Sequence, residues 1–225
     1  MMIAEFTRKR KKLQSYTWYG LVLVAVGGWF YPLLGYLLLA CMAGAVGIAV
    51  FNGRSWCDWM CPRGSFYDLF LERLSTRRRI PDFFREKRTR IAVIGVLFTV
   101  LGVQIYFAWP GFRGIGLAFV IVLTVTTSIG IMLGISVHPR TWCHICPMGT
   151  IASWFSRGKR ALRISEACVL CTACDRACPM QLAPSLNREQ GVIDDGDCVK
   201  CGTCIAVCAK TAISFAPPSV QKTAT

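Results

Sequence analysis

The sequence predicts an all-α membrane protein with a small α+β domain near its C-terminus. Three observations predict this class: two long apolar blocks, an uneven distribution of positive charge, and a cysteine-rich segment in the last third of the chain. Of the 225 residues, 54% are hydrophobic, which is above the usual share for a soluble domain. We expect four transmembrane helices, arranged as two duplicated hairpins, and then the small domain on the cytoplasmic side.

The first apolar block covers residues 16–51 and contains no Asp, Glu, Lys or Arg, and the second covers 91–137. A bilayer crossing needs about 20 apolar residues, so each block is long enough for a helical hairpin. Gly and Pro mark the two turns, at 27–32 and 110–111. A cleaved signal peptide explains the first block less well, because its apolar core would be too long. The expected spans lie near 16–31, 33–51, 91–109 and 115–137.

Positive charge marks the side of the membrane. The formal net charge is +14, and Lys and Arg gather in 1–15, 52–90 and 138–165, whereas the two outer turns hold only Arg113. By the positive-inside rule, the three basic segments and both termini face the cytoplasm. We therefore expect a multi-pass protein of the inner (cytoplasmic) membrane. Because the charge follows topology, membrane lipid is the expected anionic partner and nucleic acid is not.

The C-terminal domain contains two copies of the cysteine pattern C-x2-C-x2-C-x3-C. The first copy is Cys168, Cys171, Cys174 and Cys178, and the second is Cys198, Cys201, Cys204 and Cys208. In this pattern three thiolates on one loop ligate one [4Fe–4S] cluster, and the fourth reaches the other cluster. Zinc prefers pairs of CxxC, and disulfides do not suit a reducing compartment. We therefore assign cluster I to Cys168, Cys171, Cys174 and Cys208, and cluster II to Cys198, Cys201, Cys204 and Cys178.

A second repeat follows the two apolar hairpins. Residues 54–65 and 140–150 share the pattern R-[ST]-W-C-x(2 or 3)-C-P-x-G-[ST], which indicates an internal duplication with parallel topology. If the halves pack about a pseudo-twofold axis, the four thiols could share a [4Fe–4S] cluster on the cytoplasmic side. A copper or zinc site, a redox dithiol pair and inert thiols are the alternatives. The four thiols are Cys57, Cys61, Cys143 and Cys146.

Local signals predict the structure around these motifs. The proline after the second cysteine of each motif suits the first turn of a new helix. Ser65 and Asp68 have the spacing of a capping box, which would start a helix at Ser65. Cys41 lies alone within a span, and we interpret it as a packing residue. The expected domains are a basic N-terminus (1–15), a membrane domain (16–165), the cluster domain (166–215) and a tail (216–225).

These motifs carry two resemblances. Residues 168–208 resemble a bacterial-type two-cluster ferredoxin domain, with Ala209 where that family usually repeats a proline. Nearly the whole chain resembles the NapH/MauN group of membrane iron–sulfur proteins, although only two residues separate Cys143 from Cys146 instead of three. In that group, NapH-type members act as quinol dehydrogenase subunits that pass electrons from the quinone pool toward a reductase. Related proteins serve in regulation or in metal-centre assembly.

The leading hypothesis is a membrane-anchored electron-transfer subunit of an oxidoreductase complex, rather than a self-contained enzyme. It would hold two [4Fe–4S] clusters, and a third if the motif thiols share one, and it would connect quinone or quinol with another iron–sulfur or reductase subunit. The alternative is a maturation or regulatory factor that supplies electrons or handles metal for another enzyme. No haem is expected, because the histidines, His138 and His144, both follow the last span.

Overall fold

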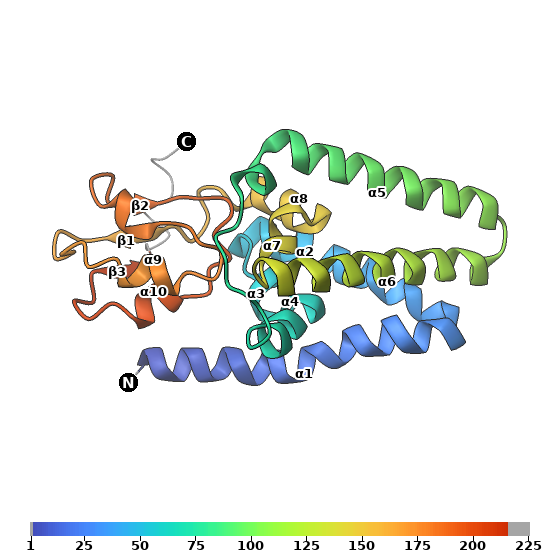
Figure 1. Cartoon of the computed structure of the whole chain (residues 1–225), viewed down its shortest axis with the longest axis horizontal. Coiled ribbons are helices and arrows are strands. Elements are labelled where there is room, and N and C mark those ends of the chain that lie inside the picture. The colour runs from blue at the N-terminus through green and yellow to red at the C-terminus, as the bar shows by residue number, and fades with distance from the viewer. Residues whose placement is uncertain (1, 216–225) are drawn as a thin grey trace.

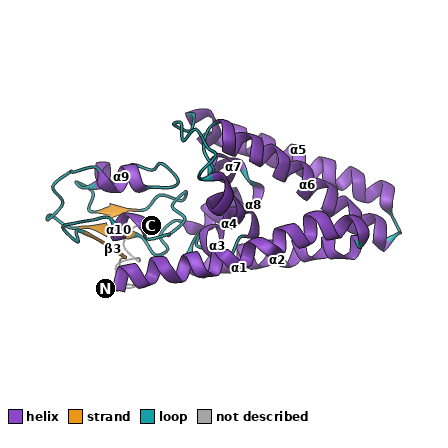
Figure 2. Cartoon of the chain, turned by 60° about the horizontal axis from the view of Figure 1, so that its bottom comes forward, coloured by secondary structure: helices purple, strands orange, loops and turns teal. Residues whose placement is uncertain are grey.

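The computed structural model describes residues 2–215. Figure 1 shows an elongated helical body with a small domain at one end, and Figure 2 shows that the strands belong to this small domain. α1 (Met2–Phe30) runs along the body from the small domain to the far end, where η1 (Pro32–Tyr36) leads into α2 (Leu37–Asn52). α5 (Lys87–Ala108) and α6 (Phe112–Ser136) follow. The predicted class, mostly helical with a small sheet, is confirmed.

Within residues 2–215, three helical segments are long and apolar enough to cross a membrane, and each has a mean hydropathy of 2.3: Pro32–Asn52, Lys87–Ala108 and Phe112–Ser136. They coincide with the last three spans expected from the sequence. The first expected span, 16–31, lies inside α1, a single helix that begins at Met2 and also carries the basic N-terminal segment. The four-span topology and its orientation therefore stay predictions.

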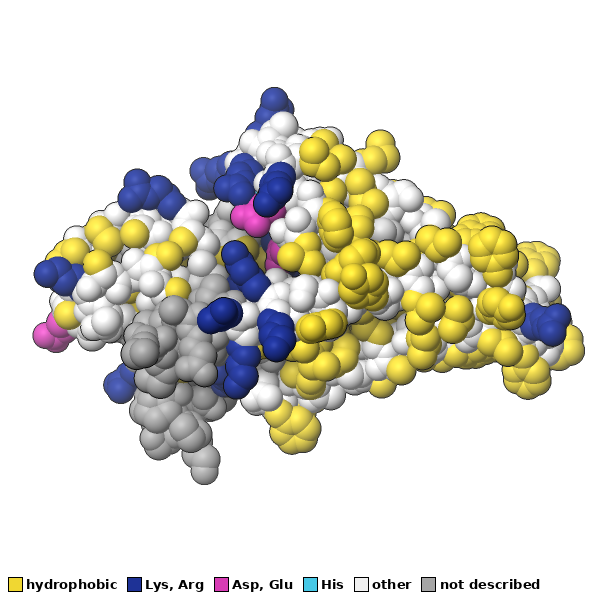
Figure 3. Space-filling model, turned by 90° about the horizontal axis from the view of Figure 1, so that it is seen from below, with side chains coloured by type: hydrophobic (Ala, Val, Ile, Leu, Met, Phe, Trp, Pro, Cys, Tyr) yellow, Lys and Arg dark blue, Asp and Glu magenta, His cyan; other side chains and the backbone are white. Residues whose placement is uncertain are grey.

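The outer surface of the helical body is largely apolar. α5 buries none of its most apolar stretch, and its exposed side chains include Val96, Val103 and Phe107. In Figure 3, hydrophobic side chains cover the helical body, and Lys and Arg gather between that body and the small domain. A surface this apolar requires a lipid or protein cover, and the lengths of the helices fit a bilayer. The chain is membrane-associated.

A pair of short helices follows each hairpin. α3 (Trp56–Trp59) and α4 (Pro62–Phe66) follow the first, and α7 (Thr141–Ile145) and α8 (Pro147–Ser156) follow the second. α4 and α8 both begin at the motif proline, as predicted, because proline has no N–H to satisfy and its fixed φ suits the first helical position. Two further segments lead from α4 to α5: η2 (Tyr67–Leu71) and η3 (Asp82–Arg85).

The predicted capping box at Ser65 is wrong. Cys61 is the N-cap of α4, and its Sγ accepts the N–H of Gly64 at 3.5 Å. The N–H of Ser65 already donates to the carbonyl oxygen of Cys61 at 2.9 Å, so Ser65 lies inside the helix and has no helix start to cap. Its buried hydroxyl instead shares a hydrogen bond of 2.7 Å with Thr17 of α1.

The small domain is built on a three-stranded antiparallel sheet. β1 (Leu162–Ile164) is the central strand, between β2 (Val192–Ile193) and β3 (Ile213–Phe215). The sheet thus uses residues that precede position 166. Three short helical segments complete the domain: α9 (Ala173–Ala177), η4 (Pro184–Asn187) and α10 (Thr203–Ala206). The buried core combines strand residues with two cysteines: Leu162, Ile164, Ile193, Ile213, Cys174 and Cys204.

Candidate functional site

The two cysteine runs of the small domain follow the same backbone path. Left-handed residues flank the second cysteine of each run and recur three residues after the fourth: Leu170, Thr172 and Gln181 in the first run, and Lys200, Gly202 and Thr211 in the second. Residues with a Cβ adopt this conformation rarely, so matched occurrences indicate a specific loop shape. Such turns can direct successive backbone N–H groups into one concavity, which suits a negatively charged thiolate cluster.

Most cysteines of these runs lie at or near the core of the sheet. Cys174 and Cys204 are core members, Cys168, Cys198 and Cys208 pack against them, and Cys171 is exposed. Cys178, the fourth cysteine of the first run, lies beside Cys198 and Cys201 of the second run. Cys204 is close to the same three thiols. Crossed ligation requires this proximity for cluster II, and the ligand assignment of both clusters stays a prediction.

Burial makes Cys174 and Cys178 poor thiolates without a metal. Burial raises the pKa of Cys178 to about 12, and it raises the pKa of Cys174 to about 11. Metal ligation requires the deprotonated thiol, so a bound cationic centre would have to supply the charge compensation. Within residues 2–215, no three His, Cys, Asp or Glu side chains are close enough to hold a single metal ion. Four thiols at each site instead fit a [4Fe–4S] cubane, because its ligands are spaced around a cluster that is larger than a single ion.

The two membrane-domain motifs bring their thiols together. Cys61 lies close to Cys57 and Cys143, and Cys143 lies close to Cys57 and Cys146. Cys57 and Cys143 belong to α3 and α7, whereas Cys61 and Cys146 are the N-cap residues of α4 and α8. The four neighbouring thiols therefore come from both halves of the duplication. Burial is the largest influence on the Cys61 and Cys143 thiols, and it raises the pKa of both.

A buried arginine from each motif reaches the other motif. Arg54 of the first motif donates a hydrogen bond to the carbonyl oxygen of Cys143, and Arg140 of the second donates to the carbonyl oxygen of Cys57 at 3.0 Å. The two side chains are 0% and 1% exposed. Each guanidinium also lies beside the first thiol of its own motif, Arg54 beside Cys57 and Arg140 beside Cys143 at 3.9 Å. The contacts are reciprocal, as a pseudo-twofold arrangement predicts.

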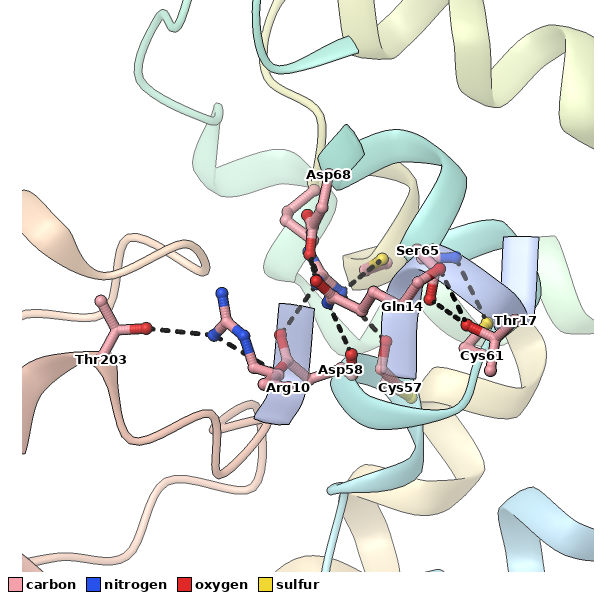
Figure 4. Close-up of polar contacts among 12 residues, drawn as sticks. Arg10, Gln14, Thr17, Cys57, Asp58, Cys61, Ser65, Asp68 and Thr203 are labelled. Carbon is pink, nitrogen blue, oxygen red and sulfur yellow. Dashed lines mark hydrogen bonds and ion pairs between the residues drawn. The ribbon is translucent and has the colours of Figure 1, made fainter. Parts of the chain in front are cut away.

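Carboxylates balance Arg140. Its guanidinium contacts Asp58 at 2.9 Å and Asp68 at 2.8 Å. Burial acts to lower the pKa of Arg140, but Asp68, Cys143 and Asp58 outweigh it and hold that pKa well above its usual value. In Figure 4, Gln14 of α1 points toward the same two residues, and its Nε2 donates to the backbone of Asp58 and the carboxylate of Asp68. α1 thus closes one side of the motif site.

Asp197 connects the small domain with this site. It immediately precedes Cys198, and its carboxylate accepts hydrogen bonds from Arg54 at 3.0 Å and from Arg90 of α5 at 2.9 Å. Burial acts to raise the pKa of Asp197, but His144 and the two arginines outweigh it and hold that pKa well below its usual value. The carboxylate is therefore charged at neutral pH.

The second cysteine run packs directly against the membrane-domain motifs. One hydrophobic cluster joins the motif residues Cys57 and Cys143 to residues of the small domain. The small-domain members are Cys178, Met180, Leu182, Cys198, Val199 and Cys201. Arg85 also donates to the backbone of Met180 and Gln181, at 3.1 and 3.0 Å. The motif thiols and the second cysteine run therefore lie side by side, while Cys168 and Cys208 pack against the core of the sheet.

An apolar cavity of about 280 Å³ adjoins the motif thiols on the side of the helical body. Cys57, Cys61 and Cys146 line it, together with apolar residues of α1, α2, α5 and α6. Arg63 is its charged residue, and it donates to Thr126 at 3.0 Å. Cys41 of α2 also lines the cavity, within electrostatic reach of Cys61. Cys41 therefore lies near other thiols, whereas the sequence predicted a lone packing residue within a span.

Sequence reasoning assigned no role to Arg54, Arg140, Asp58 or Asp197. For the two arginines a signal existed, because both motifs carry arginine three residues before their first cysteine. The carboxylates gave no comparable signal, because nothing in the sequence pairs them with a distant arginine. The four thiols that were grouped from the repeat do lie together.

Two family models of 4Fe–4S domains match the chain. A family model described as "4Fe-4S binding domain" matches residues 34–81 and 109–165, and one described as "4Fe-4S dicluster domain" matches 160–209. The first therefore covers both motifs, and the second covers both cysteine runs. No solved structure matches the chain.

Several curated proteins are similar over most of the chain. An uncharacterized protein of Methanocaldococcus jannaschii is 29% identical over 76% of this chain and 68% of its own length. The methylamine utilization ferredoxin-type protein MauN of Methylobacillus flagellatus is 30% identical over 64% of this chain and 55% of its own length. The ferredoxin-type protein NapH of Haemophilus influenzae is 26% identical over 74% of this chain and 63% of its own length. The chain thus spans less than two thirds of the last two.

The fold, the cysteine groups and the matched 4Fe–4S domains define a membrane-associated, ferredoxin-type iron–sulfur protein whose chemistry is electron transfer. Within that class, relatives named MauN and NapH, which are 25–30% identical to this chain, support a NapH/MauN-type iron–sulfur protein.

Proposed function

We propose that this protein carries electrons between the quinone pool and a partner oxidoreductase subunit on the cytoplasmic face of the membrane. The observation that supports this most is the continuous contact from the apolar cavity, through the motif thiols, to the second cysteine run. The cavity adjoins the motif thiols, and the motif thiols adjoin the second cysteine run. Electrons could therefore pass from a membrane-soluble donor to a cytoplasmic domain, or in the reverse direction.

The cavity fits the ring of a quinone better than a water-soluble donor. Its lining is almost entirely apolar, and it lies within the part of the body whose outer surface is apolar. Pockets for organic ligands combine such a lining with a few polar groups that fix orientation. Arg63 and Thr126 are the polar residues here, and their mutual hydrogen bond orients the guanidinium. A quinone in the cavity would lie next to Cys61 and Cys146.

The motif thiols would hold a third [4Fe–4S] cluster. Four thiols from two symmetric loops supply the ligand set. Clusters bound at the three groups would accept and release single electrons. The residues of the chain keep water away from the motif site, because Cys143, Trp142 and His144 are buried.

Proteins named NapH and MauN are the relatives that give this proposal its context. NapH of Escherichia coli is 25% identical over 75% of this chain. On the resemblance, the partner would be an iron–sulfur or reductase subunit that receives electrons at the small domain. Cys171, the exposed thiol of cluster I, lies on the surface such a partner would meet.

The test is to measure iron, acid-labile sulfide and EPR spectra on the full chain, purified anaerobically in detergent. We expect about twelve iron atoms per chain, which is three cubanes. Cys57→Ser should lower the count to about eight and slow quinol-dependent reduction of the two remaining clusters. The matched control is Cys41→Ser, which removes a thiol from the same cavity but not from the repeated motif. A Cys57→Ser protein with unchanged iron and unchanged rates would disprove the role of the motif site.

A second function is favoured by one observation. Cys41 brings a fifth thiol close to the motif thiols, which is more than one cubane uses. A surplus thiol suits a protein that binds and releases copper or another soft metal, or that cycles as a dithiol, during assembly of another redox enzyme. A wild-type count of about eight irons, without a reductase in stoichiometric complex, would favour this assembly role.

A further inference from the structure

The arginines of the two motifs are exchanged between the halves. Each guanidinium donates to the carbonyl oxygen of the opposite motif's first cysteine and lies beside the glycine after that motif's second cysteine. A Cβ on Gly149 would lie 2.5 Å from Nη2 of Arg54, and a Cβ on Gly64 would lie 2.6 Å from the Cys57 oxygen and 3.3 Å from Nη1 of Arg140. The arginine and the glycine of the shared pattern therefore act together across the two halves.

We propose that Arg54 and Arg140 are the positioning residues of the four-thiol site, each holding the loop of the other motif in place and supplying N–H donors beside the first thiol of its own. The redox half of this inference rests on the proposed function, because it requires a bound redox group at these thiols. The positioning half requires only the thiols and loops of this chain.

Geometry explains why arginine is needed. One guanidinium must reach a carbonyl oxygen in the opposite loop, a thiol in its own loop and a carboxylate at the same time. Arg140 does so through Nη1, toward Cys57 and Cys143, and through Nε and Nη2, toward Asp68 and Asp58. Lysine has a single nitrogen on a flexible chain and cannot reproduce this planar fork. Arginine-to-lysine replacement therefore keeps the charge and removes the geometry.

Arg54 also connects the four-thiol site to the small domain. Its Nη1 contacts Asp197, next to Cys198, while its Nη2 contacts the Cys143 carbonyl. One side chain thus ties the second motif to the second cysteine run. Arg140 has its carboxylates within the membrane domain, so it can be changed without disturbing the small domain directly. Arg140 is accordingly the cleaner test.

Hydrogen bonds to the sulfurs of a cluster raise its reduction potential, because they stabilise the more negative reduced form. Loss of the Arg140 contact to Cys143 should therefore lower the midpoint potential of a centre at the motif thiols. It should leave the potentials of the two small-domain clusters unchanged. If Arg140 had only a structural role, its replacement would not lower the potential of the motif site alone.

The experiment uses the full chain, purified anaerobically, in the variants Arg140→Lys and Gly64→Ala. The matched controls are Arg88→Lys, at an exposed arginine, and Gly95→Ala, where an added Cβ meets nothing within 4 Å. Iron per chain and an EPR-monitored redox titration are measured on each. We expect both variants either to drop from about twelve to about eight irons or to show the third signal at a lower potential, with small-domain signals intact.

The outcomes separate the two claims. Variants that keep all their iron and the wild-type potential, like the controls, overturn the inference. If Arg140→Lys also loses the small-domain signals, the chain has unfolded, and Gly64→Ala, which leaves every charge in place, decides alone. If the wild type holds only about eight irons, the proposed function fails, and so does the potential-setting role. The motif thiols are then free, and their alkylation rate decides the positioning role: faster in the variants supports it, and unchanged rates overturn it.

Discussion

The two thiol regions of this protein are held in place by different means. In the small domain, the cysteines follow one another closely along the chain, and left-handed residues at matched positions shape each loop. In the membrane domain, the cysteines come from the two halves of a duplication, and buried arginines with carboxylate partners connect the halves. The first region is specified by local backbone conformation, and the second by long-range side-chain contacts.

This difference determines how each region should fail. A loop shaped by its own backbone is sensitive to substitutions that change the allowed φ, and the damage stays local. A site held by buried ion pairs is sensitive to the loss of any one partner, because the other charge is left buried and unpaired. Substitutions of the two kinds should therefore have separable effects on the two regions.

The largest effect is expected at Asp197, which joins the two regions. Asp197→Asn removes the charge that faces Arg54 and Arg90, and it should cost about 3–5 kcal/mol of the stability of the docked arrangement. The small-domain clusters should still form, because their ligands are unchanged. Thermal unfolding in detergent and limited proteolysis between the domains measure the effect.

The control for this prediction is Glu189→Gln, which removes an exposed carboxylate of the same domain. It should change the unfolding temperature little, because exposed charges contribute little to stability. Equal melting of the two variants would mean that Asp197 does not couple the domains.

The same contrast shows what the sequence could and could not predict. The cysteine runs, the motif repeat and the helix starts at Pro62 and Pro147 are local patterns, and each has a direct physical meaning within a few residues. The side chains that assemble the membrane site are far apart in sequence: Asp197 meets Arg54 and Arg90, and Arg140 meets Asp58. No spacing rule connects such pairs, so only the packed structure identifies them.

The capping box illustrates a different limit. Ser65 and Asp68 have the correct spacing, but the motif proline starts the helix earlier, and the serine then serves as a packing contact to α1. Two valid local signals competed, and proline prevailed because its ring fixes φ. Cys41 illustrates the same limit in a span, since its position near the motif thiols depends on how α2 packs.

The next prediction tests the loop of the second cysteine run. Gly202 has φ of +71°, and Thr172 occupies the matched position in the first run with φ of +57°. Gly202→Val should cost about 1–3 kcal/mol, because a β-branched residue is strained there, and it should weaken cluster II alone. Thr172→Gly is the matched reverse change and should be neutral or stabilising. Denaturant titration with the EPR signals as probes measures both. Damage to the membrane site from Gly202→Val would contradict local control of this loop.

A smaller effect is expected beneath the membrane site. Tyr67 is fully buried, and its hydroxyl donates to the carbonyl oxygen of Thr127 at 3.3 Å. Tyr67→Phe should cost about 0.5–1.5 kcal/mol, the usual net value of one hydrogen bond. The ring still packs against Trp142 and Ile145, so the motif loops should keep their arrangement. Thermal unfolding measures the cost, and Phe66→Tyr at the neighbouring position is a size-matched control. A loss of the third EPR signal would show that this hydroxyl matters to the site itself.

The smallest effect is a pH dependence at His138, which follows α6 and precedes the second motif. Its Nδ1 accepts the backbone N–H of Arg140 at 3.2 Å, which requires the neutral ring on that side. Burial, and then the charge of Arg140, lowers the pKa of His138 to about 4.

The unfolded chain takes up this proton near the ordinary pKa of about 6.5, whereas the folded chain resists it until about pH 4. The unfolded state therefore binds more protons between these values, and stability falls as the pH decreases through this window. His138→Asn keeps an acceptor for the Arg140 N–H and cannot titrate, so it should flatten part of the decline in unfolding temperature between about pH 7 and pH 5. His144, whose pKa burial also lowers, would contribute to the remaining slope. An unchanged slope in His138→Asn would mean that His138 takes up its proton at nearly the same pH in the folded and unfolded chains, and would contradict the lowered pKa.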